Sequence, residues 1–483
     1  MMANIKNMLD SEGEVKRILK IISNLSSQEN LSVFVVGGVV RDLFMGRKLK
    51  EIDLMVVGDA IEFSRNLAHI LGVKKIVPFP KFATAKIPYK IMPIEITSAR
   101  TEKYESHSRK PAEVQFTDLK GDLIRRDFTV NAMAMSLNPD QFGELHDPFG
   151  GLKDLQKRRL ITPLDPDETF SEDPLRMMRA AYFAAALNFE IEEKCLQSIK
   201  RQWNRIKIVS AERITAELTK ILSTDKPSIG LKILQETGLM KIVFPEIHAM
   251  FGLGQTNEWH HKDIFDHTLQ VVDNAAVLSG KMELRFAALV HDIAKPVTRR
   301  IDSKKGYTFH GHDAVGERML NKVARRMKLS NELRDYLKKL TVLHLRPITL
   351  AQEEITDSAI RRVMVAAGDL SEDLLTLCRA DITTKNPHKV EKYLGNFGRV
   401  EKRILNVKER DAFKKFQSPV RGGEIMKICG LKEGKLVGRL KSALEEAILD
   451  GKIKNEYAAA HSYLMEIKDD FLNAEKKFKQ INN

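Results

Sequence analysis

Cysteine is scarce in this sequence, with three residues in 483, at positions 195, 378 and 429. Three cysteines this far apart form neither a disulfide framework nor a cysteine-rich zinc site, so a reducing cytoplasm is the expected compartment. No apolar run approaches the ~18 residues of a membrane-spanning helix, which argues against a membrane protein. The segment Met1 to Glu14 carries three acidic residues and no apolar core, so we expect no secretory signal there.

Acidic residues are fewer than basic ones, 65 against 79, which gives a formal net charge of +14. This surplus favours a polyanionic partner, although solvated lysines on a basic protein would give the same total. Apolar residues make up 43% of the chain and charged residues 30%, as in ordinary globular proteins. The length exceeds what one hydrophobic core supports, so several domains are expected.

The patterning predicts an α+β fold, with a small mixed head followed by an elongated helical body. Apolar runs typical of strands are confined to the first 150 residues, and amphipathic runs with helical spacing dominate afterwards. The expected strands are 33–36, 53–57, 82–87 and 91–97, and the clearest helices are 13–24, 174–187, 211–222 and 263–278. We expect four domains: a head (1–150), a helical neck (151–255), a histidine-rich domain (256–400) and a helical tail (401–483).

Two glycines, Gly37 and Gly38, stand where the first expected strand ends and a helix begins. Glycines at such a turn let backbone N–H groups approach a phosphate, and Arg41 lies one turn further along. A plain tight turn would need the same two glycines.

Carboxylates cluster on the expected second strand and on a later one. Glu51 and Asp53 share a strand face because side chains alternate with period two, and Glu95 lies on the later strand. Neighbouring carboxylates repel unless a cation lies between them, and Mg²⁺ prefers such oxygen ligands together with substrate phosphates. The alternative is a set of solvent-facing charges on an edge strand.

Asp173 and Arg176 lie one helical turn apart, so their side chains would project together. Ionised aspartate only accepts hydrogen bonds and arginine only donates them. Cytosine and adenine each present an amino donor beside a ring-nitrogen acceptor, so this pair suits C and A and leaves polar atoms unpaired against U and G. A helix cap and an intrahelical salt bridge would be the structural alternative.

Several motifs occur in an order that resembles the class II tRNA nucleotidyltransferases and the related bacterial poly(A) polymerases. The resemblance covers roughly residues 30 to 225. Its motifs are Gly37-Gly38-x-x-Arg41-Asp42, the acidic strand, Arg125 to Ala132, Asp147 to Gly151, Glu172 to Arg179, and Ser210 to Arg213. The resemblance implies a nucleotidyltransferase head like that of DNA polymerase beta, which extends an RNA 3′ end without a nucleic-acid template.

Site residues follow from the resemblance, position by position. Glu51 and Asp53 would be catalytic and would bind Mg²⁺, and the nucleotide would be bound by Gly38, Arg41, Arg126, Asp173, Arg176 and Arg179. Within that set Gly38 and Arg41 would hold the triphosphate, and Asp173 and Arg176 would read the base. Two further residues, Asp127 and Asn131, would shape the ribose region. Two positions depart from the family pattern: Glu51 replaces the usual aspartate, and Tyr182 stands where the family often has arginine.

Histidine is concentrated between residues 260 and 312, which contain six of the 13. The order His267, His291-Asp292 and Asp381 resembles the HD metal-dependent phosphohydrolases, and it implies that these four side chains bind one metal. Imidazole and carboxylate ligands suit divalent transition metals, which acidify water for phosphoester hydrolysis. His312 and His344 would hold a second ion or the scissile phosphate. Histidines that cap helices are the alternative.

The tail contains a basic stretch with helical period, residues 399–415, and glycines near helix starts in residues 419–463. We expect it to contact the RNA backbone, and a solvated charged face is the alternative. Together these features predict a cytoplasmic enzyme, not bound to a membrane, that uses ATP and CTP to extend the tRNA 3′ end with release of pyrophosphate. The alternatives are enzymes that add only A, only CC or poly(A), an HD phosphohydrolase whose head has become an RNA-binding module, and a purely structural RNA-binding protein.

Overall fold

A computed structural model describes residues 13–104, 111–254, 263–303, 306–350, 356–383, 388, 391, 395–404 and 418–481. The chain divides into two compact units, Met1–Ala249 with Arg326–Lys328, and Met250–Arg325 with Leu329–Asn483. Within the described ranges, no helix combines the length and the apolar character needed to cross a bilayer.

The first unit begins with a seven-stranded mixed sheet whose strand order is β3-β4-β5-β2-β1-β8-β9. All neighbouring strands pair antiparallel except β2 and β5, which run parallel. The strands are β1 (Ser32–Val36), β2 (Ile52–Val57), β3 (Val77–Phe79), β4 (Thr84–Ile87), β5 (Ile94–Ser98), β8 (Ala134–Ser136) and β9 (Leu145–His146), and β6 (Arg100–Tyr104) with β7 (Pro111–Phe116) forms a separate hairpin.

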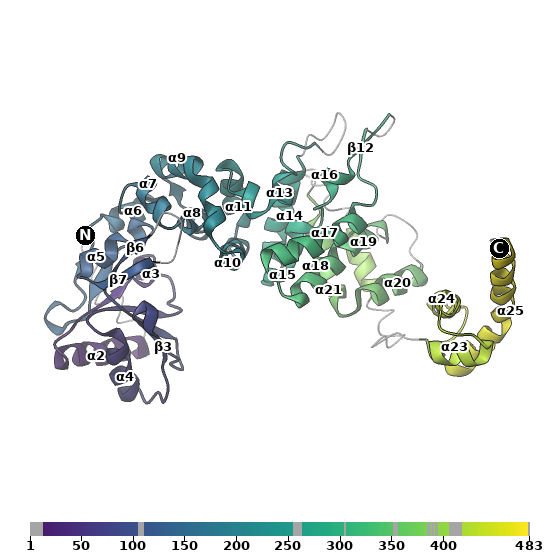
Figure 1. The fold of residues 1–483 in the computed structure, drawn as a ribbon, viewed down its shortest axis with the longest axis horizontal. Helices are drawn as coiled ribbons and strands as arrows, with labels where there is room; N and C mark the ends of the chain where they lie inside the picture. Colours follow the sequence, from purple (N-terminus) through teal and green to yellow (C-terminus); the bar gives the residue numbers. More distant parts are fainter. Residues whose placement is uncertain are drawn as a thin grey trace. The chain divides into compact units, whose positions relative to one another are not determined.

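Apolar side chains on the helices hold this sheet. α2 (Gly13–Gln28) packs on β1, and α4 (Ala60–Ile70) packs on β2, β4 and β5, with the two helices side by side in Figure 1. The side chain of Asp59 caps α4 by accepting from the backbone N–H groups of Ile61 and Glu62. The other short elements of the head are α3 (Gly38–Phe44), η1 (Pro80–Phe82), α5 (Leu119–Ile124), η2 (Thr129–Asn131) and η3 (Pro139–Gln141).

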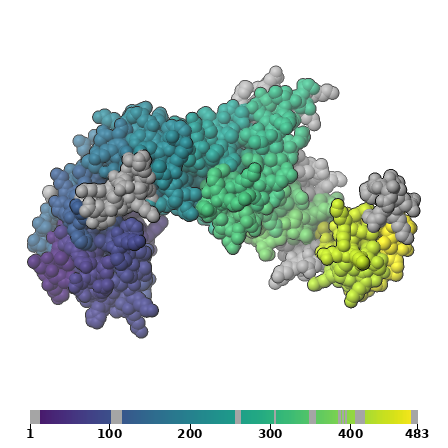
Figure 2. Space-filling model, in the orientation of Figure 1, coloured from purple at the N-terminus to yellow at the C-terminus, as the bar shows by residue number. Residues whose placement is uncertain are grey.

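Helices follow the head within the same unit, and Figure 2 shows the head and these helices as one continuous body, coloured purple to teal. α8 packs against both α10 and α11, so the helix that carries Arg176 and Arg179 is held by its neighbours. The elements are α6 (Gly151–Lys157), β10 (Arg159–Leu160), α7 (Pro166–Glu172), α8 (Leu175–Leu187), β11 (Glu190–Ile191), α9 (Glu193–Gln202), η4 (Trp203–Ile208), α10 (Ala211–Leu222), α11 (Pro227–Glu236), α12 (Met240–Val243) and α13 (Pro245–His248).

The second unit is helical apart from one short hairpin, β12 (Arg300–Asp302) with β13 (Gly306–Thr308), in the ranges described. Its helices before the tail are α14 (Ile264–Leu278), α15 (Met282–Val290), α16 (Lys295–Thr298), α17 (His312–Met327), α18 (Asn331–Leu343), α19 (Leu345–Leu350), α20 (Asp357–Ala367), η5 (Gly368–Leu370) and α21 (Ser371–Ala380). The tail helices α23 (Gly422–Cys429), α24 (Lys435–Leu449) and α25 (Tyr457–Ile481) pack around a separate apolar core that includes Ile425, Leu440 and Leu464.

The expected α+β class, with a sheet in the head and a helical body, is confirmed. The predicted helices correspond to α2, α8, α10 and α14, and the predicted strands correspond to β1, β2, β4 and β5. Two strand pairs in the body, β10 with β11 and β12 with β13, were not expected from the sequence. Within the expected helix 399–415, residues 405–415 lie outside the described ranges, as do residues 1–12 of the segment examined for a signal.

Candidate active site and metal centre

A cavity of about 640 Å³ opens in the first unit between the sheet and the helices that follow it. Its walls come from the β1–α3 turn with α3, β2, the residues from Arg126 to Asn131, Asp173, α8 and α10. They carry six basic and four acidic side chains, so the lining is net positive. The lining residues are Gly37, Gly38, Arg41, Asp53, Arg126, Asp127, Asn131, Asp173, Leu175, Arg176, Arg179, Tyr182, Phe183, Arg213, Ala216, Glu217 and Lys220.

Asp53 lines this cavity, and two further carboxylates, Glu51 and Glu95, lie close enough to act on it electrostatically. Asp53 lies on β2 and is directly opposite Glu95 on the parallel strand β5, which confirms the expectation that Glu95 is on a neighbouring strand. Glu51 immediately precedes β2 and is exposed, and only Asp53 of the three lines the cavity. Burial, together with repulsion from Glu51 and Glu95, raises the pKa of the Asp53 carboxyl to about 7.

The donor chemistry of these carboxylates fits a divalent cation. Arg126 and Lys86 lower the pKa of Asp53, but burial and the two neighbouring carboxylates raise it by more. The negative charge of ionised Asp53 therefore lacks full compensation by nearby positive charge. An ion bound by Asp53 and its neighbours would supply that compensation, and oxygen-only ligands are the type that Mg²⁺ prefers. Glu51 lies just outside β2, so the structure does not show the strand face that the sequence analysis expected it to share with Asp53.

Gly37 makes the turn between β1 and α3 possible. Its φ of 71° is in the left-handed region, and a Cβ added there would lie 2.7 Å from Nη1 of Arg126. Gly37 therefore allows both the backbone turn and the position of the Arg126 guanidinium. Arg126 is oriented on its other side by Asp122, whose Oδ2 accepts from Nη2 at 2.9 Å.

Arg41 is buried and lines the cavity from α3. Its Nη1 donates to Oδ1 of Asn131 at 2.7 Å, and its Nε and Nη2 donate to Asp42. The guanidinium also lies 5.3 Å from the ring centroid of Phe183, a cation–π distance. Arg41 is therefore fixed at the cavity wall by its neighbours.

Asp127 organises the opposite wall. Its Oδ2 accepts from Nε of Arg179 at 2.6 Å, and its Oδ1 accepts from Nδ2 of Asn131 at 3.0 Å. Burial alone would raise the pKa of Asp127, but the Arg179 guanidinium lowers it below its usual value. Asp127 is therefore held ionised, and it fixes both Arg179 and Asn131.

Asp173 and Arg176 both line the cavity, as expected from their spacing. Asp173 follows α7, and its Oδ1 accepts from the backbone N–H of Leu175 at 3.1 Å. Arg176 is buried, and its Nη1 donates to Oε2 of Glu172 and to the carbonyl of Thr169, both at 3.1 Å. The two side chains share the cavity, and Arg176 forms an ion pair with Glu172.

The wall formed by α10 has no counterpart in the predicted site. Arg213, Glu217 and Lys220 line the cavity at positions i, i+4 and i+7 of this helix, which places them on one face. Glu217 is buried and accepts from Nζ of Lys220 at 2.8 Å, while its Oε2 has no hydrogen-bond partner among the described residues. The helical spacing of these three charges was the available signal.

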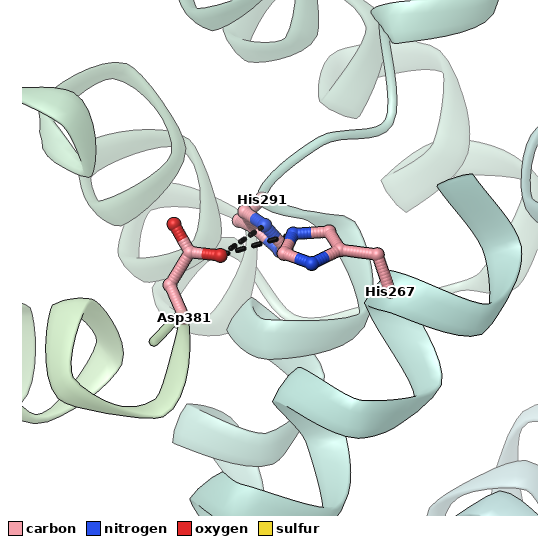
Figure 3. A group of neighbouring side chains, drawn as sticks. All are labelled: His267, His291 and Asp381. Carbon is pink, nitrogen blue, oxygen red and sulfur yellow. Dashed lines mark ion pairs between the residues drawn. The ribbon is translucent and has the colours of Figure 1, made fainter. Parts of the chain in front are cut away.

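The second unit gathers the predicted HD residues around one point. His267 extends from α14, His291 follows α15 and Asp381 follows α21, and Figure 3 shows the three side chains pointing toward one another. Nε2 of His267 lies 3.0 Å from Oδ1 of Asp381, and Nε2 of His291 lies 3.6 Å from the same oxygen. Oδ2 of Asp292 lies 3.1 Å from Nε2 of His291.

The atoms of this cluster are suited to a metal ion. Nε2 of His291 and Oδ1 of Asp381 are buried and have no hydrogen-bond partner among the described residues, while Oδ2 of Asp292 lies 2.5 Å from Nζ of Lys295. Burial would lower the pKa of His291, but Asp292 and Asp381 raise it to about 10. Buried donor atoms that converge without hydrogen bonds fit a cation with imidazole and carboxylate ligands.

His312 and His344 lie on the far side of Asp292. Oδ1 of Asp292 is 3.2 Å from Nε2 of His312 and 3.7 Å from Nε2 of His344. Burial, and secondarily the nearby His291, lowers the pKa of His344 to about 4. All six predicted residues of the histidine-rich domain therefore lie in one cluster.

Comparison with known families matches three parts of the chain. Residues 33–161 match the family described as "Poly A polymerase head domain", and residues 188–251 match "Probable RNA and SrmB- binding site of polymerase A". Residues 264–385 match "HD domain".

Curated relatives and solved structures extend these matches. A protein named "Multifunctional CCA protein" from Vibrio campbellii is 33% identical over 363 residues, which cover 73% of this chain and 85% of the relative. A protein with the same name from Shewanella denitrificans is 33% identical over 63% of this chain and 72% of its own length. The fold is similar to that of the Bacillus stearothermophilus CCA-adding enzyme solved in complex with CTP, with a TM-score of 0.67 at 23% identity, covering 98% of this chain and 100% of that one.

Proposed function

Because the chain belongs to the family of class II tRNA nucleotidyltransferases and bacterial poly(A) polymerases, with an HD domain, we propose that it adds C and A to the 3′ end of tRNA. The names of the relatives, "Multifunctional CCA protein", support addition of CCA. The nucleotide donors are CTP and ATP, and pyrophosphate is released.

The observation that carries this proposal is the position of Asp53. This carboxylate lines a cavity with a net positive lining, and two further carboxylates act on it electrostatically. An acidic cluster beside a wall of basic side chains suits a reaction of a triphosphate. The acids would bind divalent ions, and these ions together with the arginines would neutralise the negative charge of the triphosphate. A purely RNA-binding surface would have no use for a half-buried acid with a raised pKa.

In the proposed mechanism Asp53 and Glu51 hold Mg²⁺, which would activate the attacking hydroxyl and stabilise the pyrophosphate when bound. Arg41 and Arg126 bind the triphosphate beside the glycine turn. Both are already oriented, Arg41 by Asn131 and Arg126 by Asp122, so binding requires little reorganisation of these side chains.

Base selection is assigned to Asp173 and Arg176. Asp173 accepts a hydrogen bond from the exocyclic amino group of C or A, and Arg176 donates to the adjacent ring nitrogen. Arg176 makes hydrogen bonds through Nη1 and Nη2, and arginine has five N–H donors in total. Against U or G the polarity is reversed, and each unpaired buried group costs about 1–3 kcal/mol.

The test uses tRNA transcripts that lack the terminal CCA, CA or A, each incubated with one labelled nucleoside triphosphate. We expect CTP to extend the first transcript, CTP then ATP to complete it, and ATP alone to extend the transcript that lacks A. Extension with A only, CC only or long A tails would instead identify one of the restricted activities. Asp53→Ala should abolish all extension, and extension by this variant would contradict the catalytic assignment.

The converging HD residues support a second activity. We propose that His267, His291, Asp292 and Asp381 hold a divalent transition metal that would acidify a water for hydrolysis of RNA phosphomonoesters or 2′,3′-cyclic phosphates. Hydrolysis of 2′,3′-cyclic AMP in the presence of Mn²⁺ or Ni²⁺, and its loss in His291→Ala, would support the assignment. No hydrolysis by the wild-type protein with any of the first-row metals would contradict it.

The helical tail is assigned to RNA contact. α24 and α25 border an open groove of about 550 Å³ lined by residues that include Lys435, Arg439 and Phe471. The guanidinium of Arg439 lies 5.6 Å from the Phe471 ring centroid, so a cation and an aromatic face meet there. Such surfaces favour RNA phosphates and bases. A cytoplasmic location is part of the same proposal and is supported by a tRNA substrate.

A further inference from the structure

One face of the sheet in the head leads from the Asp53 carboxylate to the outermost strand. Residues that pair directly across neighbouring strands project on the same side of a sheet. Asp53 on β2 pairs with Glu95 on β5, and Glu95 pairs with Lys86 on β4. Lys86 in turn pairs with Val77 on β3, which ends the strand order. One row of side chains therefore connects Asp53 with the edge of the sheet.

A second row lies beside the first and ends in an aromatic ring. Thr97 on β5 pairs with Thr84 on β4, and Thr84 pairs with Phe79 on β3. Side chains alternate along each strand, so this row shares the face of the first row. The outer end of this face is open, with 47% of Val77 and 45% of Phe79 exposed. We call four residues of this face the sheet-edge strip: Glu95, Lys86, Val77 and Phe79.

The opposite face of the same strands is covered. Its residues on β4 and β5 are Ala85, Ile87, Ile94 and Ile96, and all four are fully buried. α4 packs on both of these strands. A sheet with one buried face often leaves the other to solvent, so the composition of the open face decides whether it suits a partner.

The residues around the sheet-edge strip are basic and aromatic. The segment 74–90 contains five lysines, three aromatic residues and no aspartate or glutamate. Two of the aromatic rings, Phe79 and Phe82, are about half exposed. Lysines attract phosphates, and exposed aromatic faces stack on bases. This combination fits single-stranded nucleic acid.

The strand order decides from which side an RNA end reaches Asp53. β2 lies between β1 and β5 in the sheet. The triphosphate is assigned to Gly38 and Arg41 in the β1–α3 region, so pyrophosphate leaves on the β1 side. The attacking and leaving oxygens of such a transfer lie roughly in line. The RNA hydroxyl therefore approaches from the β5 side, where the sheet-edge strip begins.

We propose that the sheet-edge strip binds the last nucleotides of the RNA 3′ end, with Phe79 and Val77 against a base and Lys86 on a phosphate. The proposal rests on the nucleotidyl transfer proposed above and names the surface that holds its RNA substrate. Neighbouring strands are about 4.8 Å apart, so the strip extends roughly 14 Å from Asp53. The terminal hydroxyl can therefore lie at Asp53 while the preceding nucleotides lie on β4 and β3.

The first test measures steady-state kinetics with ATP and a tRNA that lacks the terminal A. Phe79→Ala should raise the KM for this tRNA at least about fivefold, the smallest effect expected from the loss of one stacked base. The KM for ATP and kcat should stay unchanged, because the nucleotide cavity is not altered. Ile70→Ala is the control, since it removes a side chain of α4 that is 49% exposed, and it should change none of these constants.

The second test measures binding of the same tRNA, fluorescently labelled, by anisotropy at several salt concentrations. Lys86→Gln should reduce the slope of log Kd against log salt by about 0.7, the value for one phosphate contact to a single strand. Binding is measured without turnover because Lys86 also acts electrostatically on Asp53. Lys20→Gln, which neutralises an exposed lysine on α2, is the control and should leave the slope unchanged.

The outcomes separate this proposal from the one on which it rests. A wild-type protein that extends tRNA, with an unchanged KM for tRNA in Phe79→Ala and an unchanged slope in Lys86→Gln, would overturn the strip and keep the proposed function. An increase in the KM for ATP alone would also overturn the strip, since the ring would then act on the nucleotide. A wild-type protein that extends no tRNA would overturn both. Circular dichroism of each variant checks that it is folded.

Discussion

The Asp53 carboxyl connects the chemistry of the head to its stability. Its folded-state pKa of about 7 exceeds the ordinary value of 3.8, so folding favours the protonated form. This favourable contribution is present below pH ~4 and is lost as the pH rises through 7, above which the ionised group opposes folding. A bound divalent cation removes that penalty.

Replacing Asp53 with asparagine therefore stabilises the metal-free protein at pH 8. Each pKa unit corresponds to about 1.4 kcal/mol, so the substitution should raise the free energy of unfolding by about 2–4 kcal/mol. The midpoint of thermal unfolding in chelator should be higher in Asp53→Asn than in the wild type at pH 8, with a smaller difference at pH 5. Mg²⁺ should raise the midpoint of the wild type only. Equal midpoints at pH 8 would contradict the raised pKa.

Glu51 tests how far the metal geometry tolerates an extra methylene. Mg²⁺ demands near-octahedral geometry, and the family usually has aspartate at this position. Glu51→Asp should preserve or raise the rate of tRNA extension, measured as kcat/KM for ATP. Complete loss of extension would show that this head uses a geometry adapted to the longer side chain.

At the scale of the element, a matched pair of glycines flanks α3, with Gly37 before the helix and Gly46 after it. Gly37 and Gly46 have φ values of 71° and 65°, but only a Cβ at Gly37 would contact Arg126. Alanine at either position costs about 1–2 kcal/mol of stability because of the left-handed backbone. Gly37→Ala should also displace the Arg126 guanidinium and raise the KM for nucleotides about tenfold, corresponding to ~1.4 kcal/mol.

Steady-state kinetics with ATP and a tRNA that lacks the terminal A measure this difference. Gly46→Ala serves as the control, since it has the same backbone strain and no atom within 4 Å of the added Cβ. An unchanged KM in Gly37→Ala would show that Arg126 does not bind the nucleotide.

Elements with a complete periodic pattern could be predicted from the sequence. α10 begins and ends where its amphipathic period does, and β1 and β2 contain the apolar runs 33–36 and 54–57 that are typical of buried strands. β3 could not be predicted, since all three of its residues are exposed and its pairing with β4 alone defines it. Short strands of this kind depend on tertiary contacts rather than on local pattern.

Residues of the candidate site could be predicted from the sequence where they are adjacent in the chain. Asp53 was found as an acidic residue beside an apolar strand run, and His291-Asp292 was found from its motif, whereas the register that puts Glu95 opposite Asp53 comes from the structure. Glu217 was not predicted, because a single acid on an amphipathic helix looks like any solvated charge until the fold buries it. Its position beside Lys220 depends on how α10 packs against α8.

At the scale of the whole molecule, the two candidate sites lie in separate compact units. Variants at one site should therefore leave the other intact. Asp53→Ala should lose at least about 10³-fold in tRNA extension and retain hydrolysis of 2′,3′-cyclic AMP, and His291→Ala should show the reverse. Loss of both activities in either folded variant would contradict independent sites.

The net charge of +14 gives a second prediction at this scale. Binding of tRNA through phosphate contacts releases counterions, so affinity falls with salt at a slope of about −0.7 to −0.9 per contact. For roughly four contacts, Kd should rise by about 10²-fold between 50 and 200 mM KCl. Fluorescence anisotropy of labelled tRNA measures this slope, and a flat response would exclude backbone contacts as the main source of affinity.

The strand order of the head has a consequence for biosynthesis. β5 lies between β4 and β2 in the sheet, but it leaves the ribosome after α4, β3 and β4. Until it emerges, the apolar strand β2 keeps an open edge in the middle of the future sheet, and such edges invite pairing with other chains. The nascent head is therefore most exposed to aggregation while the segment between β2 and β5 is being translated, and it is then that a ribosome-associated chaperone would protect it.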